Sequence, residues 1–477
     1  MTPYTSLEKI QQALRSGELS CQVLVDHYLQ QIEKNEALNA YIEVFGEEAR
    51  ARALELDAQY QRDPNSVGRL FGAVISIKDL LCYKDHEVNG GSKILEGFTA
   101  LYSATAVERL LAEDAIIIGR NNCDQFGMGS ASEHSHFGPV RNAADPTRIA
   151  GGSSGGSAVA VQAQTCLASI GTDTGGSVRQ PAALCGVVGV KPSYGRISRY
   201  GLLAYASSFD QIGVLAHNVA DAALLLEIMA GPDEFDSTAS QQAVPAYSQQ
   251  LDFSTKAKIA YFEPALNHPK LDAAIKAGSL ALIEQLKTAG HTVEAVDFDY
   301  LEYMVPAYYV LTTAEASSNL SRYDGIRYGH RSTAASNLLE TYQKSRTEGF
   351  GKEAKRRIML GTFVLSAGYY DAYYTKAQKV RRLVQQQTFE ILENYDFILM
   401  PVTTSTAWAI GEKVDDPVEN YLADIYTVQA NMAGIPAVSL PLGQHSDGLP
   451  FGIQILGNRF KEADLLAFSY HLSKEFK

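Results

Sequence analysis

Residues 151–177, GGSSGGSAVAVQAQTCLASIGTDTGGS, decide the fold class of this chain. Two loops rich in glycine and serine enclose a helix predicted over Ser157–Gln164 and a strand predicted over Cys166–Gly171. Glycine tolerates positive φ and lets the backbone approach a ligand closely. Two such turns inside apolar sequence can therefore direct successive amide N–H groups at one point. The stretch predicts a loop, helix, strand and loop, with a binding site where the strand ends.

The same alternation of strands and helices continues on both sides of this unit. Phe71–Ile77 is predicted to form a buried strand that ends at Lys78, and a helix over Ala106–Glu113 precedes a strand over Ala115–Gly119. Late strands are predicted at Phe397–Pro401, Ala437–Leu442 and Phe451–Leu456. We therefore expect an α/β fold, with a large mixed β-sheet core covered by helices on both faces.

The domain organisation follows from the same pattern. We expect a single domain over residues 1–477, although the length alone would also allow about three domains. A helical segment over residues 1–65 is expected to pack on this domain. Residues 251–300, with two predicted strands around a helix, form a possible inserted subdomain. Helices are expected to dominate from Tyr303 to Glu393.

Composition limits the classes of function. The 477 residues are 46% hydrophobic and 20% charged, which is typical of a globular enzyme and excludes disorder as the main state. The formal net charge is −13. Such a chain is not expected to hold a phosphate backbone by itself, because nucleic-acid affinity depends on Lys and Arg. Any nucleic acid is expected to be held by a partner.

Cysteines and apolar runs indicate the compartment. The five cysteines are scattered and lack any C-x-x-C spacing, so reduced thiols and no structural metal are expected. No run reaches the roughly 18 apolar residues of a membrane span. The first residues also lack the regions of a signal peptide. We expect a cytoplasmic protein with no membrane association.

The first Gly/Ser loop has three possible meanings. Such composition is typical of a flexible linker. However, Ser157 is predicted to cap the apolar helix that follows, which would tie the loop to a helix start with free N–H groups. A phosphate-binding loop is disfavoured because neither Gly-Lys-Ser/Thr nor G-x-G-x-x-G is present. A catalytic loop is favoured.

The base that would serve such a loop is predicted to be a lysine. Neither loop contains histidine, and the G-x-S-x-G turn of Ser-His-Asp hydrolases is missing. His134 and His136 are more typical of polar loop residues. Lys78 ends an apolar strand, where burial disfavours its ammonium; lowering its pKa by about three units costs on the order of 4 kcal/mol. A neutral Lys78 could accept a proton from a serine.

These residues resemble the amidase signature family. The matching elements are Lys78, the GGSSGGS loop and DTGGSVRQPA, with Ser177 placed 24 positions after Ser153. The resemblance implies the amidase signature fold and a Ser-cisSer-Lys triad. In it Ser177 would be the nucleophile, Ser153 the bridging serine and Lys78 the base. The same resemblance implies an oxyanion hole made of the backbone N–H groups of Thr174, Gly175, Gly176 and Ser177.

Other segments narrow the resemblance to the glutaminase subunits of tRNA-dependent amidotransferases. They begin at Gly189 (GVKPSYGRISRYGL), Ala206 (ASSFDQIG), Glu315 (EASSNLSRYDGIRYG) and Lys355 (KRRIMLG). The resemblance implies that the chain releases ammonia from glutamine. The ammonia would pass to a tRNA-binding partner subunit, in a complex that also holds a small third subunit. ATP and Mg²⁺ would be used by the tRNA-binding partner, and this chain would need no cofactor. Glu-tRNA(Gln), Asp-tRNA(Asn) or both would be amidated, with tRNA held only indirectly.

The resemblance also implies a glutamine pocket. Arg357 would hold the α-carboxylate, Asp424 the α-ammonium, and Tyr308 would hydrogen-bond the ligand. The backbone around Met128 and Gly129 would line the pocket. From the residues alone, Lys355-Arg356-Arg357 is equally typical of a solvated helix face and Asp424 of a surface acid.

Two other functions are compatible with parts of the sequence. A stand-alone amidase for small amides would share the triad but would not need Arg357 and Asp424. A non-catalytic scaffold that only binds partner subunits would not need Lys78, Ser153 and Ser177. The complete set of these residues favours the glutaminase over both alternatives.

Overall fold

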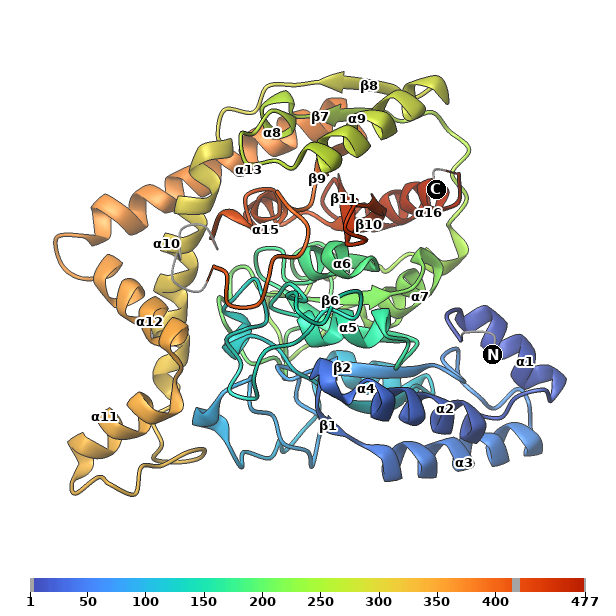
Figure 1. Cartoon of the computed structure of the whole chain (residues 1–477), viewed down its shortest axis with the longest axis horizontal. Helices are drawn as coiled ribbons and strands as arrows, with labels where there is room; N and C mark the ends of the chain where they lie inside the picture. The colour runs from blue at the N-terminus through green and yellow to red at the C-terminus, as the bar shows by residue number, and fades with distance from the viewer. Residues whose placement is uncertain (1–3, 414–420, 476–477) are drawn as a thin grey trace.

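The computed structural model describes residues 4–413 and 421–475, and its core is one mixed sheet of eleven strands (Figure 1). The strand order is β1-β3-β2-β4-β6-β5-β10-β11-β9-β7-β8. The strands are β1 Tyr41–Val44, β2 Val74–Lys78, β3 Ile116–Asn121, β4 Ala168–Asp173, β5 Val188–Lys191, β6 Gln211–Ala216, β7 Lys258–Tyr261, β8 Thr292–Ala295, β9 Phe397–Pro401, β10 Ala437–Gln444 and β11 Pro450–Gly457. The predicted α/β class is confirmed.

Strands inside the sheet, away from its edges, are covered on both faces. Every residue of β2, β3 and β4 is buried, although alternate side chains of a strand point to opposite faces. This explains why their sequences are apolar without alternation. Helices α5 (Gly155–Gln162) and α6 (Arg179–Cys185) pack on the middle strands, and α7 (Val219–Met229) and α16 (Glu462–Glu475) form a second packed pair. The prediction of helices on both faces is therefore confirmed.

Parallel pairing brings the ends of two strands to one edge of the sheet. β2 runs parallel to both β3 and β4, with Ile77 opposite Ile170. The carboxyl ends of β2 and β4 therefore lie side by side. Lys78 is the last residue of β2 and Asp173 the last of β4, so the two chemically distinctive stretches of the sequence meet there.

Two further groups of helices lie toward the β1 side and toward the β8 side of the sheet. Near β1 they are α1 Leu7–Ser16, α2 Cys21–Lys34, α3 Gly46–Arg62 and α4 Thr105–Ala112; near β7 and β8 they are α8 Glu263–Leu266 and α9 Ala273–Thr288. Residues 251–300 thus contribute β7 and β8 to the same sheet. No helix in the described ranges is long and apolar enough to cross a membrane.

A helical arm extends along one side of the molecule, on the left of Figure 1. We define it as residues 301–394. It comprises α10 Leu301–Asn319, α11 Leu338–Gly349, α12 Lys352–Val364, a π-helical turn at Tyr370–Thr375 and α13 Lys376–Asn394. Helices α12 and α13 both pack against α10, and α15 (Val428–Ala433) contacts α10 and α13.

A buried ion pair joins the central strand β4 to the elements that follow it. Arg179 Nη2 lies 3.0 Å from Asp173 Oδ1, and both side chains are fully buried. Arg179 also donates to Gln454 on β11 and to Asn431 on α15, at 2.8 and 2.7 Å. Burial alone would raise the pKa of Asp173, but the guanidinium of Arg179 holds this pKa at about 2. The carboxylate is therefore ionised near neutral pH.

Removing the cation of this pair is predicted to destabilise the fold strongly. Arg179→Met leaves the Asp173 carboxylate buried without its counter-ion, which costs about 3–5 kcal/mol. Denaturant unfolding monitored by circular dichroism measures this change. Arg331→Met, at an exposed position, is the control and should stay within about 0.5 kcal/mol of the unmodified protein. Equal effects of the two substitutions would contradict the prediction.

Candidate active site

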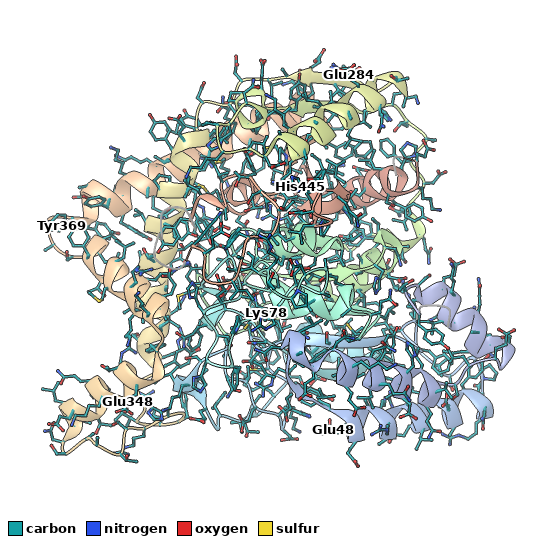
Figure 2. The ribbon with its side chains drawn as sticks, in the orientation of Figure 1. Glu48, Lys78, Glu284, Glu348, Tyr369 and His445 are labelled. Atoms are coloured by element: carbon teal, nitrogen blue, oxygen red, sulfur yellow. The ribbon has the colours of Figure 1, made fainter. Side chains whose placement is uncertain are left out.

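Lys78 lies in the interior at the carboxyl end of β2, near the centre of the view in Figure 2. Its side chain is completely buried. Its Nζ donates to three hydroxyl groups, those of Ser153, Ser154 and Thr172, at 2.7, 2.9 and 2.9 Å. The contact between Lys78 and Ser153 was predicted from the family resemblance. The contacts of Lys78 with Ser154 and Thr172 were not predicted. For Ser154, the only indication in the sequence was its place in the GGSSGGS loop, next to Ser153.

The surroundings of Lys78 make a larger fraction of it neutral near pH 7 than of a free lysine. Burial lowers the pKa of Lys78 to about 8, because a buried ammonium loses its hydration. The nearby Cys123, Asp124 and Asp173 act in the opposite direction and limit this decrease. An amine with this pKa can exchange a proton with Ser153 near neutral pH.

The first Gly/Ser loop is an ordered part of the interior. Residues 150–161 are all buried, and the Gly152–Ser153 peptide bond is cis. Gly152 N donates to Gln180 Oε1 at 2.8 Å, and Gly155 N donates to Ser132 Oγ at 3.0 Å. A Cβ on Gly152 would overlap the Asp124 carboxylate. The loop is therefore fixed on every side, which is incompatible with a flexible linker.

The predicted cap of the following helix was wrong. α5 begins at Gly155, two residues earlier than expected, and Ser154 occupies the position before it. Ser157 lies inside the helix and its hydroxyl is directed at Asn121 Oδ1, 3.5 Å away. Two glycines start this helix because the approach of neighbouring backbone leaves no room for side chains; a Cβ on Gly156 would overlap Asn122 O. Helix propensity alone could not reveal this crowding.

Ser177 lies in the second loop, directly beside the first. The two loops are joined by a hydrogen bond from Ser154 N to Ser177 O, 3.1 Å long. Ser177 Oγ makes no hydrogen bond to another residue in the described part of the chain, and the residue is 8% exposed. The hydroxyl is therefore available to a ligand, but its predicted hydrogen bond to the bridging Ser153 is not formed in this structure.

The backbone of the second loop offers some of the predicted oxyanion donors. Within the described ranges, the N–H groups of Thr174, Gly175 and Ser177 make no hydrogen bond. Gly176 N, however, donates to Asp173 Oδ1 at 2.9 Å. The prediction that Gly176 also contributes therefore requires this bond to be given up. The Gly175 carbonyl accepts from Thr427 Oγ1 at 2.5 Å, which fixes the direction of the peptide group.

Arg357 is buried at the inner face of α12, although the two basic residues before it are partly exposed. Its Nε donates to Glu353 Oε1 at 2.8 Å and its Nη1 to the Tyr205 hydroxyl at 3.0 Å. The guanidinium also lies over the rings of Tyr309 and Tyr421, at 5.2 and 5.5 Å. Arg357 Nη2 has no hydrogen-bond partner among the described residues. Arg357 is therefore not part of a solvated helix face, which was the alternative interpretation of Lys355-Arg356-Arg357.

Asp424 is also buried, and two hydroxyl groups hold it. Ser130 Oγ donates to it at 2.9 Å and Tyr309 Oη at 2.7 Å. Burial raises the pKa of Asp424 to about 6. Tyr309 thus connects the two charged groups, since its ring contacts Arg357 and its hydroxyl reaches Asp424. The surface-acid interpretation of Asp424 does not hold either.

The other predicted pocket residues lie around the same loops. Tyr308 packs against Gly175 so closely that a Cβ there would overlap the tyrosine hydroxyl. Met128 is completely buried, and Gly129 lies against the Asp124 carboxylate, where no side chain fits. Sequence reasoning missed Ser130, Tyr309 and Glu353. Only Glu353 had a local signal, because it precedes Arg357 by one helical turn.

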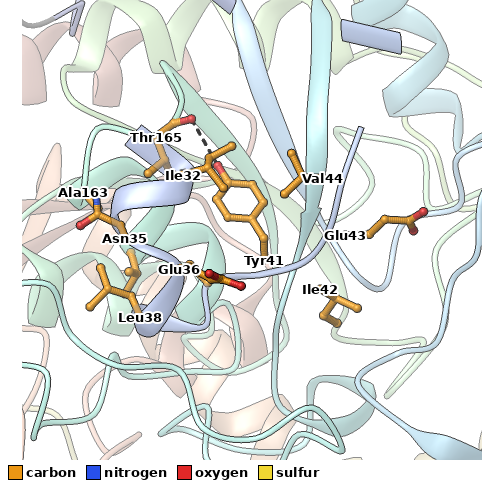
Figure 3. A pocket seen from close by; sticks show the side chains of 12 residues that line it. Ile32, Asn35, Glu36, Leu38, Tyr41, Ile42, Glu43, Val44, Ala163 and Thr165 are labelled. Carbon is orange, nitrogen blue, oxygen red and sulfur yellow. Dashed lines mark hydrogen bonds between the residues drawn. The ribbon is translucent and has the colours of Figure 1, made fainter. Parts of the chain in front are cut away.

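A separate cavity of about 190 Å³ lies beside the edge strand β1 (Figure 3). Tyr41 projects into it and shares a hydrogen bond of 3.0 Å with Thr165. Its lining contains no lysine, arginine, histidine, cysteine or serine. The described residues also contain no group of three or more His, Cys, Asp or Glu side chains that could hold a metal ion.

A buried lysine that contacts a serine of one glycine-rich loop, next to a second such loop that carries another serine, fits the requirements of serine hydrolases without histidine. Comparison with known proteins agrees with this class. The profile of the family described as Amidase matches residues 23–466, and the chain belongs to this family.

Named relatives cover the whole chain. The A subunit of glutamyl-tRNA(Gln) amidotransferase from Chlorobium phaeobacteroides (strain BS1) is 48% identical over 472 residues, which are 99% of each protein. The crystal structure of the protein of the same name from Thermotoga maritima is 36% identical, with a TM-score of 0.79 over 98% of this chain and 94% of that one. The native peptide amidase from Stenotrophomonas maltophilia is 29% identical, with a TM-score of 0.82 over 99% of this chain and 97% of that one.

Amide hydrolysis is predicted to follow the ionisation of Lys78. Because only the neutral amine accepts a proton, kcat/KM should rise with pH and level off above about 8. A pH series from 6 to 9.5 with a primary amide substrate measures this. Lys78→Arg should be inactive throughout, since a guanidinium stays protonated. A flat profile, or activity in Lys78→Arg, would contradict the role of Lys78.

Proposed function

We propose that this chain is the glutamine-hydrolysing component of a tRNA-dependent amidotransferase. The observation that carries the proposal is the pair of buried, oppositely charged groups, Arg357 and Asp424, beside a serine–lysine cluster. A buried charge is costly unless it is partnered. Two such groups at one pocket are suited to a ligand that carries both a carboxylate and an ammonium group. The names of the relatives at 36% to 48% identity support the same conclusion.

The pocket residues would divide the recognition of glutamine. The unpartnered Nη2 of Arg357 would bind the α-carboxylate, while Glu353 holds the other side of the guanidinium. Asp424 would bind the α-ammonium group. Tyr308, packed against Gly175, would place the side-chain amide near Ser177, with the backbone of Met128 and Gly129 lining the pocket.

The proposed reaction proceeds through an acyl-enzyme. Neutral Lys78 takes a proton from Ser153 Oγ, which takes one from Ser177 Oγ as this oxygen attacks the amide carbon. The oxyanion is stabilised by the backbone N–H groups of Thr174, Gly175 and Ser177, and by that of Gly176 if it is released from Asp173. The amide nitrogen leaves as ammonia with the proton returned through Ser153. Water then attacks the ester, and glutamate and free Ser177 are formed.

Transfer of the ammonia would be the task of two partners. The proposal includes a larger partner that binds tRNA and uses ATP and Mg²⁺, together with a small third subunit, in the cytoplasm. The substrate would be Glu-tRNA(Gln), Asp-tRNA(Asn) or both. The net charge of −13 supports an indirect role toward tRNA.

A stand-alone amidase is the second candidate, because the peptide amidase shares the fold with a TM-score of 0.82. The fold therefore does not separate the two functions. The buried Arg357 and Asp424 favour an amino-acid amide over a simple amide. A non-catalytic scaffold would have no use for the buried contact between Lys78 and Ser153.

If this chain only supplies ammonia from glutamine, removing its proposed nucleophile should stop the glutamine-dependent reaction and leave the ammonium-dependent one. In a complex reconstituted with both partner subunits, Ser177→Ala should abolish glutamine-dependent amidation of misacylated tRNA. Amidation driven by high ammonium chloride should persist near the rate of the unmodified complex. Both reactions are measured as conversion of Glu-tRNA to Gln-tRNA. If the ammonium-driven reaction is lost while the complex stays assembled, the chain has a role beyond glutamine hydrolysis.

Glutamine binding is predicted to weaken in acid through Asp424. As pH falls through about 6, the raised pKa of Asp424 means that its carboxylate becomes neutral and loses its attraction for the α-ammonium group. The KM for glutamine should therefore rise about tenfold per unit below pH 6, in initial-rate measurements. In Asp424→Asn the KM should be high already at pH 7.5 and nearly independent of pH. A KM of the unmodified enzyme that stays constant from pH 5 to 7.5 would exclude this role.

A further inference from the structure

Residues 205–210, with the sequence YASSFD, lie just before β6 and contact two of the proposed substrate-binding side chains. The Tyr205 hydroxyl accepts a hydrogen bond of 3.0 Å from Arg357 Nη1. The ring of Phe209 meets the ring of Tyr308 edge-on, with 5.6 Å between the two centroids. The position of this segment therefore affects the position of the side chains proposed to hold glutamine.

The carboxylate of Asp210 closes this segment into a turn. It is 2% exposed and accepts hydrogen bonds from the backbone N–H groups of Tyr205, at 2.9 Å, and Ala206, at 3.0 Å. Burial raises the pKa of Asp210 to about 6, so the group is mostly ionised at pH 7.5 and both of its oxygens act as acceptors. Because a buried acceptor without a donor is costly, the turn is held firmly to this side chain.

The same carboxylate holds the loop that carries the proposed oxyanion donors. Thr174 Oγ1 donates to Asp210 Oδ1 at 2.7 Å. Strands β4 and β6 are antiparallel with Asp173 opposite Gln211, so the next pair of residues at this end of the two strands is Thr174 and Asp210. The sheet therefore brings these two residues together although they are 36 positions apart in the sequence.

The chemistry of glutamine gives this connection a use. A fixed chain of carbon atoms separates the α-carboxylate of glutamine from the amide carbon that Ser177 would attack. The groups that bind the two ends must be held at a matching separation, because a small misplacement lowers the rate strongly. Arg357 lies on α12 and Thr174 on the loop after β4. Asp210 links the two through Tyr205.

We propose that Asp210 is a positioning residue that holds the oxyanion loop and the carboxylate-binding arginine at a fixed separation. On one side Asp210 orients Thr174, whose backbone N–H is a proposed oxyanion donor. On the other side it holds Tyr205, whose hydroxyl orients Arg357. This inference rests on the function proposed above. Asp210 does not contact the substrate, since protein donors occupy both of its oxygens.

The test is the steady-state hydrolysis of glutamine by the complex reconstituted with both partner subunits, measured as kcat and KM per folded molecule. Asp210→Asn should lower kcat and raise KM, each about tenfold, because an amide group cannot accept from the hydroxyl and both N–H groups together. Thr174→Val removes one donor and should lower kcat about tenfold with KM within about threefold. Tyr205→Phe removes the acceptor of Arg357 and should raise KM about fivefold with kcat within about twofold.

Asp221→Asn is the matched control. Asp221 is also a buried carboxylate, and it accepts from Leu7 N at 3.1 Å and from Asn218 Nδ2 at 2.7 Å, which joins α1 to α7. Burial raises the pKa of Asp221 to about 6 as well. This substitution should lower the thermal unfolding midpoint but leave kcat and KM of the folded complex within about twofold of the unmodified one. A rise in KM in Asp221→Asn equal to that in Asp210→Asn overturns the proposal.

The split between kcat and KM separates positioning from a structural role. If Asp210→Asn lowers only the unfolding midpoint, or lowers kcat with KM constant, the proposal is overturned. If Asp210→Asn does not fold, Thr174→Val decides, since it keeps the carboxylate and removes only one donor. Unchanged kcat in Thr174→Val then overturns the proposal. Thr174→Ser keeps the hydroxyl and should retain kcat within about threefold, and an equal loss in Thr174→Ser and Thr174→Val overturns it too.

Arg357→Ala tests the proposed function separately from the role of Asp210. This variant should raise the KM for glutamine about 100-fold, because the α-carboxylate loses its cation. If KM stays constant in Arg357→Ala, the proposed glutamine pocket itself fails. If KM rises in Arg357→Ala but not in Asp210→Asn, the pocket stands and only the positioning role of Asp210 is refuted.

Discussion

The buried ion pair between Asp173 and Arg179 is the constraint on which the rest of the site depends. The Asp173 carboxylate accepts hydrogen bonds from the backbone of Gly176 and Val178, and so determines the course of the loop that presents Ser177. Arg179 carries this constraint to β11 and α15 through Gln454 and Asn431. Strand, loop and helix are thereby fixed together. A nucleophile on a loop is placed accurately only when its backbone has no other conformation of similar energy.

Burial has different consequences for two charged groups of the site, Asp173 and Lys78. Asp173 is buried with its counter-ion and stays ionised, so it serves structure. Lys78 is buried among hydroxyl groups without a direct counter-ion, and burial lowers its pKa to about 8. Both groups lose hydration, but Asp173 stays charged near neutral pH, whereas Lys78 can exchange a proton there. The difference lies in the partners, because hydroxyl groups satisfy hydrogen bonds without compensating a full charge.

The helical arm joins the site to the surface. One face of α12 brings Arg357 over the rings of Tyr205, Tyr309 and Tyr421, while Glu353 on the same helix holds the guanidinium. The opposite face carries Met359 and Phe363 into solvent.

The sequence by itself determined the α/β class and the buried strands, because apolar strands and glycine-rich turns are local features. The contact of Lys78 with Ser153 was expected only from the family resemblance, since the two residues are 75 positions apart. The sequence did not determine that Ser154 and Thr172 also reach Lys78, that Ser157 lies inside α5, or that Gly176 N is bound by Asp173. Nor could it show that Ser130 and Tyr309 hold Asp424, nearly 300 and more than 100 positions away. Only tertiary structure decided these contacts, since burial and the pairing of distant segments set which polar groups find a partner.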